Sequence, residues 1–282
     1  SNDIWREAGG MVPIFGDTSP TFVRGDITIL KETDGGDDGQ WYDEDDEVEG
    51  DDFAIGQINL TGHELAKAIP ISWKLKKMSI EAFIPYITTL LAEKTGAALA
   101  KAIVSGPGQP GVGDDFKPQP RGILTVLNAE DNKPQVVEYG DGGQGEAAVF
   151  SYETLTLALS KIKSAYKSGA VIYANNGTIW NTLANLKDTT GRPYFVADVT
   201  SGGVGRIFGL TVKEDDSVGG GGVLIGNLKK GYAININEDI TMYRQDHVRK
   251  RYTDYMSYAI VDGDVITTKA FAYIAKEAVE EG

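Results

Sequence analysis

The sequence predicts an α+β fold, and three features carry that prediction. A long segment, 79–103, places apolar residues at helical spacing. Shorter runs, among them 21–31 and 232–243, alternate apolar and polar residues as strands do. The region 151–186 is predicted as helix, strand and helix, an order that indicates an α/β layer. At 282 residues the chain is long enough to bury a sizeable core.

The helix predicted over 79–103 is the element around which the rest of the chain is organised. Ser79 is a suitable N-cap, and Pro85 predicts either a kink or a start near Ile84. Gly96 costs on the order of 1 kcal/mol relative to alanine. The length of roughly 35–39 Å favours a spine, with an ordinary long core helix as the alternative. The apolar stripe consists of Ile80, Phe83, Ile84, Ile87, Leu90, Leu91 and Ala98.

The N-terminal residues, 1–20, mix apolar side chains with glycine and proline and show no sustained period. A segment of this kind packs poorly by itself, so we expect an extended arm that lies on another surface. Trp5 and Phe15 are prominent apolar side chains of this arm. We predict that both contact a neighbouring subunit.

A strongly acidic segment lies between runs that are predicted as strands, 21–31 before it and 53–60 and 65–75 after it. This acidic segment, 34–52, holds eleven acidic residues and no basic one, and removing it from the net charge of −14 leaves −3. The arrangement predicts a projecting hairpin with no core partner in its own chain. A solvated, disordered loop is the alternative. Calcium binding is disfavoured because the EF-hand spacing is absent.

The second half of the chain is predicted to alternate between helices and strands. Amphipathic helices are expected over 151–168 and 178–186, with Trp180 facing inward on the second. The dipeptide Asp262-Gly263 is a hairpin signal and is expected to join the last two strands. The expected strands are 170–174, 207–213, 223–225, 232–243, 252–261 and 265–274.

Composition and motifs exclude several kinds of site. The absence of cysteine excludes disulfides, thiol catalysis and cysteine-ligated metals. His63 and His247 are far apart and are each expected at the surface or an interface. Glycines at 106, 108 and 111 match G-x-G-x-x-G, but they follow a helix and therefore predict a turn. We expect no catalytic, cofactor or metal site.

Charge and hydropathy limit the possible partners. A net charge of −14 argues against a sequence-independent nucleic-acid binder, which needs a basic face. No apolar run approaches the length that crosses a bilayer, so no membrane partner is expected.

The order of several short motifs points to a family. The long helix ends in Ser-Gly-Pro-Gly at 105–108, and Pro-Arg-Gly-Ile-Leu follows at 120–124. Leu-Lys-Asp-Thr-Thr-Gly-Arg occupies 186–192, and Phe-Gly-Leu-Thr-Val occupies 208–212. The pattern continues at 226–232, 262–263 and 270–271. In this order the motifs resemble those of the major capsid proteins of tailed bacteriophages with the Hong Kong 97-type fold, although Thr211 stands where proline is commoner.

The resemblance implies an architecture and a function. It implies an N-terminal arm (1–20), an extended loop (21–72), a peripheral domain (73–124 and 246–282) and an axial domain (125–245). The implied function is a major capsid protein that self-assembles into the icosahedral head shell of a tailed bacteriophage. The scaffolding segment that many members carry upstream is absent, which we expect to reflect a prohead protease if Ser1 is native.

The resemblance also implies partners and a location. The partners are sister subunits in hexamers and pentamers, portal and scaffold or decoration proteins, and enclosed double-stranded DNA bound without sequence specificity. The location is the virion, with assembly in the cytoplasm of the bacterial host.

Charge indicates where copies meet. We expect the acidic segment of one subunit to dock on the densest basic stretch of a neighbour, with Trp41 and Tyr42 as an apolar anchor. The residues that carry opposite charge are Asp43, Glu44, Asp45 and Asp46 on one side and Arg244, Arg249, Lys250 and Arg251 on the other. The lysine–asparagine cross-link of some members is not expected, because Lys31 is the only loop lysine nearby and 244–256 contains no asparagine.

Two alternatives come from other classes. An encapsulin, a bacterial nanocompartment that encloses protein cargo, shares the fold of these capsid proteins. An α/β enzyme would use carboxylates of the acidic segment. Acid–base catalysis needs buried carboxylates with perturbed pKa values, whereas these lie in a glycine-bearing charged run.

Overall fold

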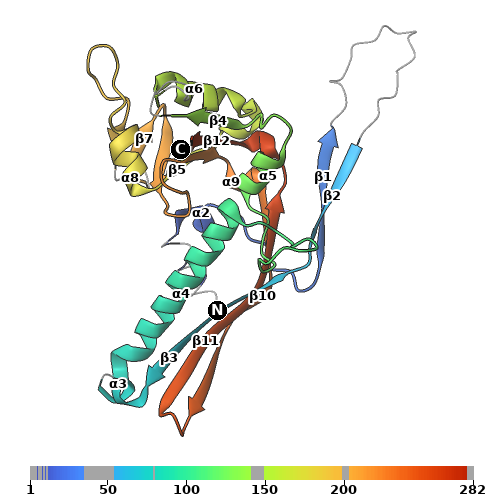
Figure 1. The fold of residues 1–282 in the computed structure, drawn as a ribbon, viewed down its shortest axis with the longest axis vertical. Coiled ribbons are helices and arrows are strands. Elements are labelled where there is room, and N and C mark those ends of the chain that lie inside the picture. Colours follow the sequence, from blue (N-terminus) through green and yellow to red (C-terminus); the bar gives the residue numbers. More distant parts are fainter. Residues whose placement is uncertain are drawn as a thin grey trace.

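A computed structural model describes residues 5, 8, 10, 12–34, 54–78, 80–140, 149–198 and 203–277. Within them it contains a two-stranded ribbon, a three-stranded sheet and a seven-stranded sheet, with one long helix beside the three-stranded sheet (Figure 1). The prediction of an α+β fold is confirmed. None of the described helices combines the length and the apolar character needed to cross a membrane.

The long helix, α4 (Ile80–Ser105), follows a short helix, α3 (Trp73–Met78). Pro85 lies inside α4, so the alternative start near Ile84 is wrong. The predicted N-cap, residue 79, lies outside the described residues. The buried stripe runs through Ile87, Leu91, Thr95 and Leu99, whereas Ala98, predicted to be buried, is exposed.

The three-stranded sheet packs one face against α4. Its strands, in spatial order, are β10 (Tyr232–His247), β11 (Tyr252–Val265) and β3 (His63–Ser72), and both pairings are antiparallel. A small apolar cluster joins sheet and helix through Ile71, Ile87, Leu91 and Tyr255. The strand predicted over 65–75 ends at Ser72, and α3 begins at the next residue.

The hairpin predicted at Asp262-Gly263 is wrong. Strand β11 continues through both residues, which pair with Asn235 and Ile234 of β10. The local turn signal is overridden because β10 lies against this end of β11, while β3 pairs up to Val261 on its other side. After β11 the chain forms the 3₁₀ turn η3 (Thr268–Ala270) and enters the other sheet as β12 (Phe271–Lys276).

The seven-stranded sheet forms the upper body in Figure 1. Its strands, in spatial order, are β4 (Val136–Tyr139), β12, β9 (Val223–Gly226), β5 (Val171–Ala174), β8 (Leu210–Glu214), β7 (Gly205–Ile207) and β6 (Val196–Ala197). The accompanying helices are α5 (Ile123–Ala129), α6 (Tyr152–Lys161), α7 (Ser164–Lys167), α8 (Asn176–Thr178), the π-helix η1 (Ile179–Leu183) and α9 (Leu228–Gly231). Leu155, Ile172, Ile225 and Ile274 are fully buried in its core.

Three predictions in this body need correction. The helix predicted over 151–168 is broken between α6 and α7, although Ser151 does cap α6 by accepting from the Thr154 amide. The strand predicted over 207–213 is a tight hairpin, because Phe208 and Gly209 both adopt positive φ and turn the chain. Trp180, predicted to face inward, lies in the π-helix η1. Its side chain is 47% exposed and packs edge-on against Phe195.

The predicted hairpin exists as an antiparallel ribbon of β1 (Ile27–Asp34) and β2 (Ala54–Leu60). It projects from the body toward the upper right of Figure 1. The pairing runs from Ile27 with Leu60 to Asp34 with Ala54. The acidic segment beyond Asp34 lies outside the described residues.

Candidate inter-subunit surfaces

The described residues of the N-terminal arm include side chains that pack against their own chain. Trp5 and Phe15 are 5% and 4% exposed, and their ring centroids lie 5.6 Å apart. The Trp5 Nε1 donates a hydrogen bond of 2.7 Å to Asp239 Oδ1 of β10. The expectation that these two side chains contact a neighbour is therefore revised, because the chain's own core already covers them.

The arm crosses α4 at Gly96. A Cβ added to this glycine would lie 3.1 Å from the Cβ of Ala8 and 3.3 Å from Cγ2 of Val12. The helix thus accepts a residue of low helix propensity where the arm needs close approach.

A partly buried polar network holds the next residues of the arm. Asp17, just after α2 (Pro13–Gly16), accepts from Lys213 Nζ at 2.7 Å and from the Tyr173 hydroxyl at 2.6 Å. Burial, and then the nearby Asp17 carboxylate, raise the pKa of Tyr173, so this phenol stays protonated and donates. The network connects the arm to β5 and β8 of the seven-stranded sheet.

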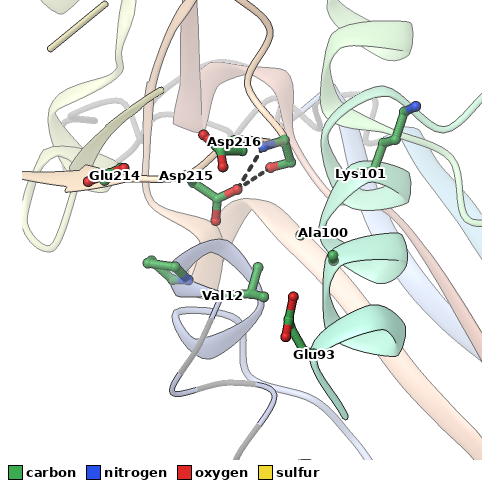
Figure 2. Close-up of a pocket in the computed structure, with 10 residues that line it drawn as sticks. Val12, Glu93, Ala100, Lys101, Glu214, Asp215 and Asp216 are labelled. Atoms are coloured by element: carbon green, nitrogen blue, oxygen red, sulfur yellow. Dashed lines mark hydrogen bonds between the residues drawn. The ribbon is translucent and has the colours of Figure 1, made fainter. Parts of the chain in front are cut away.

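A cavity of about 570 Å³ opens beside the arm, between α4 and the residues that follow β8 (Figure 2). Asp215 lies against it and is 5% exposed. Its carboxylate accepts hydrogen bonds from the Ile14 amide at 3.0 Å and from the Ser217 amide at 3.0 Å, so both of its oxygens have a donor within the protein. Among the described residues, no group of three or more His, Asp or Glu side chains is arranged to hold a metal ion.

The base of the β1–β2 ribbon is fastened by Asp262. Its carboxylate accepts from the amides of Thr61 at 2.9 Å and Gly62 at 3.2 Å, and it lies 3.3 Å from His63 Nε2. His63 is 8% exposed, so the prediction that it lies at the surface or an interface is wrong. Two residues farther along β11, burial raises the pKa of Asp264.

Two buried asparagines of β10 hold the chain that leads into the ribbon. Asn235 Oδ1 accepts from the Val23 amide at 3.1 Å, and its Nδ2 donates to the Val23 carbonyl at 3.0 Å. Asn237 Nδ2 donates to the Gly25 carbonyl at 2.7 Å. The ribbon is thus fixed at its base.

Away from its base, the ribbon has little cover from its own chain. Ile58 and Leu60 are buried together with Ala233, and all three lie near the base. Leu30, farther out, is 65% exposed. An isolated two-stranded ribbon is at best marginally stable in water. In the described part of the chain no third strand pairs with β1 or β2.

At the opposite end of the molecule, α3 and the turn between β10 and β11 lie together (Figure 1). The Trp73 amide donates to the Arg251 carbonyl at 3.1 Å, and Trp73 Nε1 donates to Thr253 Oγ1 at 3.2 Å. This contact gathers five exposed cationic side chains, which we name the basic end: Lys74, Lys77, Arg249, Lys250 and Arg251.

The predicted site residues fall into four groups. Trp5 and Phe15 are internal, and the acidic and aromatic candidates at 41–46 lie outside the described residues. Arg244 pairs with Asp246 of its own strand at 2.8 Å, which raises the pKa of Arg244. The other three basic candidates belong to the basic end. Sequence reasoning missed the lysines of α3, although the charge pattern of 74–77 was visible.

His247 is half-buried rather than free. Its Nε2 lies 2.9 Å from Asp254 Oδ2, and its ring stacks on Tyr252 at a centroid distance of 4.5 Å. This pair ties the ends of β10 and β11 together next to the basic end.

One comparison with known proteins identifies a family. The model of the Phage capsid family matches residues 2–276. A search of curated protein sequences found no match.

Solved structures share the fold at low sequence identity. The capsid of an empty GTA particle computed with C5 symmetry has a TM-score of 0.73 and 20% identity, covering 95% of this chain and 90% of that one. The satellite phage P4 procapsid including the size determination (Sid) protein gives 0.67 and 12%, covering 98% and 90%. A structure from Mycobacterium phage Bobi gives 0.64 and 14%, covering 95% and 91%.

Proposed function

The chain belongs to the Phage capsid family and is a major capsid shell protein with the Hong Kong 97-type fold, and we propose that its copies assemble into the icosahedral head shell of a tailed bacteriophage. The observation that carries this proposal is the projecting β1–β2 ribbon. It is fixed at its base by Asp262 and Asn235, yet the part beyond the base has no further strand beside it in the described chain. We assign this cover to other copies of the chain.

The physical argument concerns the two edges of the ribbon. Among the described residues each strand pairs on one side only, which leaves a row of backbone donors and acceptors on the other. Apolar area removed from water is worth about 25 cal/mol per Å², so covering Leu30 and the open edges favours association. We therefore assign a structural rather than catalytic role to the chain, which its family membership supports.

The proposal includes partners and a location. Sister subunits would form pentamers and hexamers, and portal, scaffold or decoration proteins would complete the particle. Double-stranded DNA would be enclosed without sequence-specific contacts, which the charge of −3 outside the acidic segment suits, because a strongly basic wall would hold DNA through many phosphate contacts. Assembly would take place in the bacterial cytoplasm, and the chain would reside in the virion.

The proposal also divides the chain into an arm (1–20), an extended loop (21–72), a peripheral domain (73–124 and 246–282) and an axial domain (125–245). The pairing of β11 with β3 and β10 joins the extended loop, the peripheral domain and the axial domain in one sheet.

The contents of native particles test this function. We expect particles purified from the producing cells to contain double-stranded DNA that resists added nuclease and becomes sensitive once the shell is opened. The measurement is gel analysis of nucleic acid and protein before and after disruption. Particles that hold a protein cargo and no protected DNA would identify the chain as the shell of a nanocompartment instead.

A further inference from the structure

We propose that the cavity between the arm and α4 binds a linear aliphatic polyamine, whose ammonium groups pair with carboxylates around the cavity while its methylene chain lies on an apolar floor. The volume of about 570 Å³ is typical of sites for small molecules. The cavity is built within one chain, so this inference goes beyond the proposed function and does not depend on it. Failure of the chain to form particles would leave the binding test unaffected.

The floor of the cavity is apolar and comes from two elements. Val12 and Pro13 contribute from the arm, at the start of α2, and Ala97 and Ala100 contribute from α4. Their side chains offer neither a hydrogen-bond donor nor an acceptor. A peptide backbone or a hydrated inorganic cation on this floor would lose hydrogen bonds to water without replacement, whereas methylene groups have none to lose. The floor therefore favours an aliphatic chain.

Carboxylates lie on both sides of this floor (Figure 2). Glu93 extends from α4, and Glu214, Asp215 and Asp216 follow one another from the end of β8. Within the described part of the chain, Glu214 and Asp216 form no ion pair. Glu93 pairs with Lys94 of its own helix at 3.1 Å, and a pair between exposed side chains contributes little. These carboxylates thus retain charge for a cationic ligand.

Asp215 adds a buried negative charge beside the cavity. Its hydrogen bonds come from neutral donors, and among the described residues no cation pairs with it. The nearby Lys213 donates to Asp17 instead, at 2.7 Å. Lys101 also lines the cavity, but Figure 2 shows its amino group directed away from the carboxylates. Buried charges in proteins are usually paired, so an ammonium group at this position would be stabilised.

The arrangement of the carboxylates distinguishes between kinds of cation. No three of them within the described residues are placed to hold one metal ion. They are distributed around an apolar surface, which matches a cation whose charges are separated by methylene groups. A linear polyamine has this structure, and the assignment is therefore to a polyamine and not to a metal ion.

Calorimetric titration of the full chain with spermine tests the proposal. We expect saturable binding of about one spermine per chain, which weakens as salt rises. Magnesium ions at the same concentration as spermine should not displace it, and displacement would overturn the proposal.

Tetralysine with blocked ends distinguishes a free polyamine from a lysine-bearing protein partner. It carries the same number of positive charges as spermine, and we expect it to bind about fivefold or more weakly, because its backbone amides would meet the apolar floor. Equal or tighter binding of tetralysine would assign the cavity to a lysine-bearing partner and would overturn the polyamine assignment.

A rim variant tests the carboxylates. It combines Glu93→Gln, Glu214→Gln and Asp216→Asn, which remove charge and nearly preserve shape. Asp215 is left unchanged because it holds the Ile14 amide of the arm. We expect the rim variant to bind spermine about tenfold or more weakly than the wild type. Binding at the wild-type level would overturn the proposal.

A floor variant tests the cavity while every carboxylate stays in place. Ala97 is exposed and lines the cavity, so Ala97→Phe places a ring in the space of the ligand without entering the core. We expect this variant to bind spermine about tenfold or more weakly. Spermine bound elsewhere, for example at the acidic segment (34–52), would bind the floor variant as tightly as the wild type, and this result would overturn the proposal.

A matched control carries the same loss of charge at another place. Asp115→Asn, Asp131→Asn and Glu138→Gln change exposed residues that do not line the cavity, so binding should alter by no more than about twofold. The thermal midpoints of all variants without ligand should match the wild type, and spermine should raise the midpoint of the wild type and the control only. Equal weakening in the rim variant and the control would mean a general attraction to an acidic protein and would overturn the proposal.

Discussion

Replacing Gly122 with alanine is expected to lower the free energy of unfolding by roughly 3 kcal/mol. The added Cβ would lie 2.4 Å from the Gly106 amide nitrogen and 2.7 Å from the Ser105 amide nitrogen, at the end of α4. Both are backbone atoms, so no side chain can swing away. The Gly122 amide also donates to the Gly106 carbonyl at 2.8 Å, and the shift would strain this bond. Ile123, the next residue, is fully buried and would move with it.

The measurement is denaturant-induced unfolding of the variant beside a matched control. Gly219→Ala is the control, because nothing lies within 4 Å of the Cβ it would add and its φ is not positive. The control should stay within about 0.5 kcal/mol of the wild type. A Gly122→Ala chain with the wild-type midpoint would show that α4 and α5 do not depend on this close approach.

Replacing Asp262 with alanine is expected to cost about 2–4 kcal/mol of unfolding free energy. The change removes the acceptor for the Thr61 and Gly62 amides and leaves the buried His63 without its partner. Because these contacts fasten the base of the ribbon, we expect the variant to be cut faster by protease around 21–62. Unfolding curves and time courses of limited proteolysis measure the two effects.

Asp262→Asn separates the role of the acceptor from that of the charge. An asparagine keeps one side-chain oxygen for the amides, so its loss of stability should be the smaller of the two. If alanine and asparagine variants were both as stable and as protease-resistant as the wild type, the ribbon would be held by other contacts, such as those of Asn235 and Asn237.

Features determined by local pattern could be predicted from the sequence. The helix of 80–105 and the pairing of β1 with β2 both follow from periodicity along one stretch of chain. The turn at Asp262-Gly263 could not be excluded in this way, because the residues that pair with it, Asn235 and Ile234 of the preceding strand β10, lie outside the local sequence pattern. Trp180 was misplaced for a related reason, since a π-helical turn has no simple sequence signature.

The candidate surfaces were only partly predictable. The basic turn stands out in the sequence, but its neighbour α3 was predicted as strand because 65–75 alternates. The seating of Trp5 and Phe15 in the chain's own core depends on Asp239 and on the close approach at Gly96. In the sequence, this close approach is indicated by Gly96, because glycine lowers the stability of a helix relative to alanine or leucine.

The central claim is that copies of this chain form a closed shell in which neighbouring copies cover the β1–β2 ribbon. Negative-stain electron microscopy of the purified full chain over a range of concentrations tests it most directly. We expect closed particles of uniform diameter that appear cooperatively as concentration rises. A chain that stays monomeric at every concentration, with β1 and β2 protected from hydrogen exchange in that monomer, would contradict the claim.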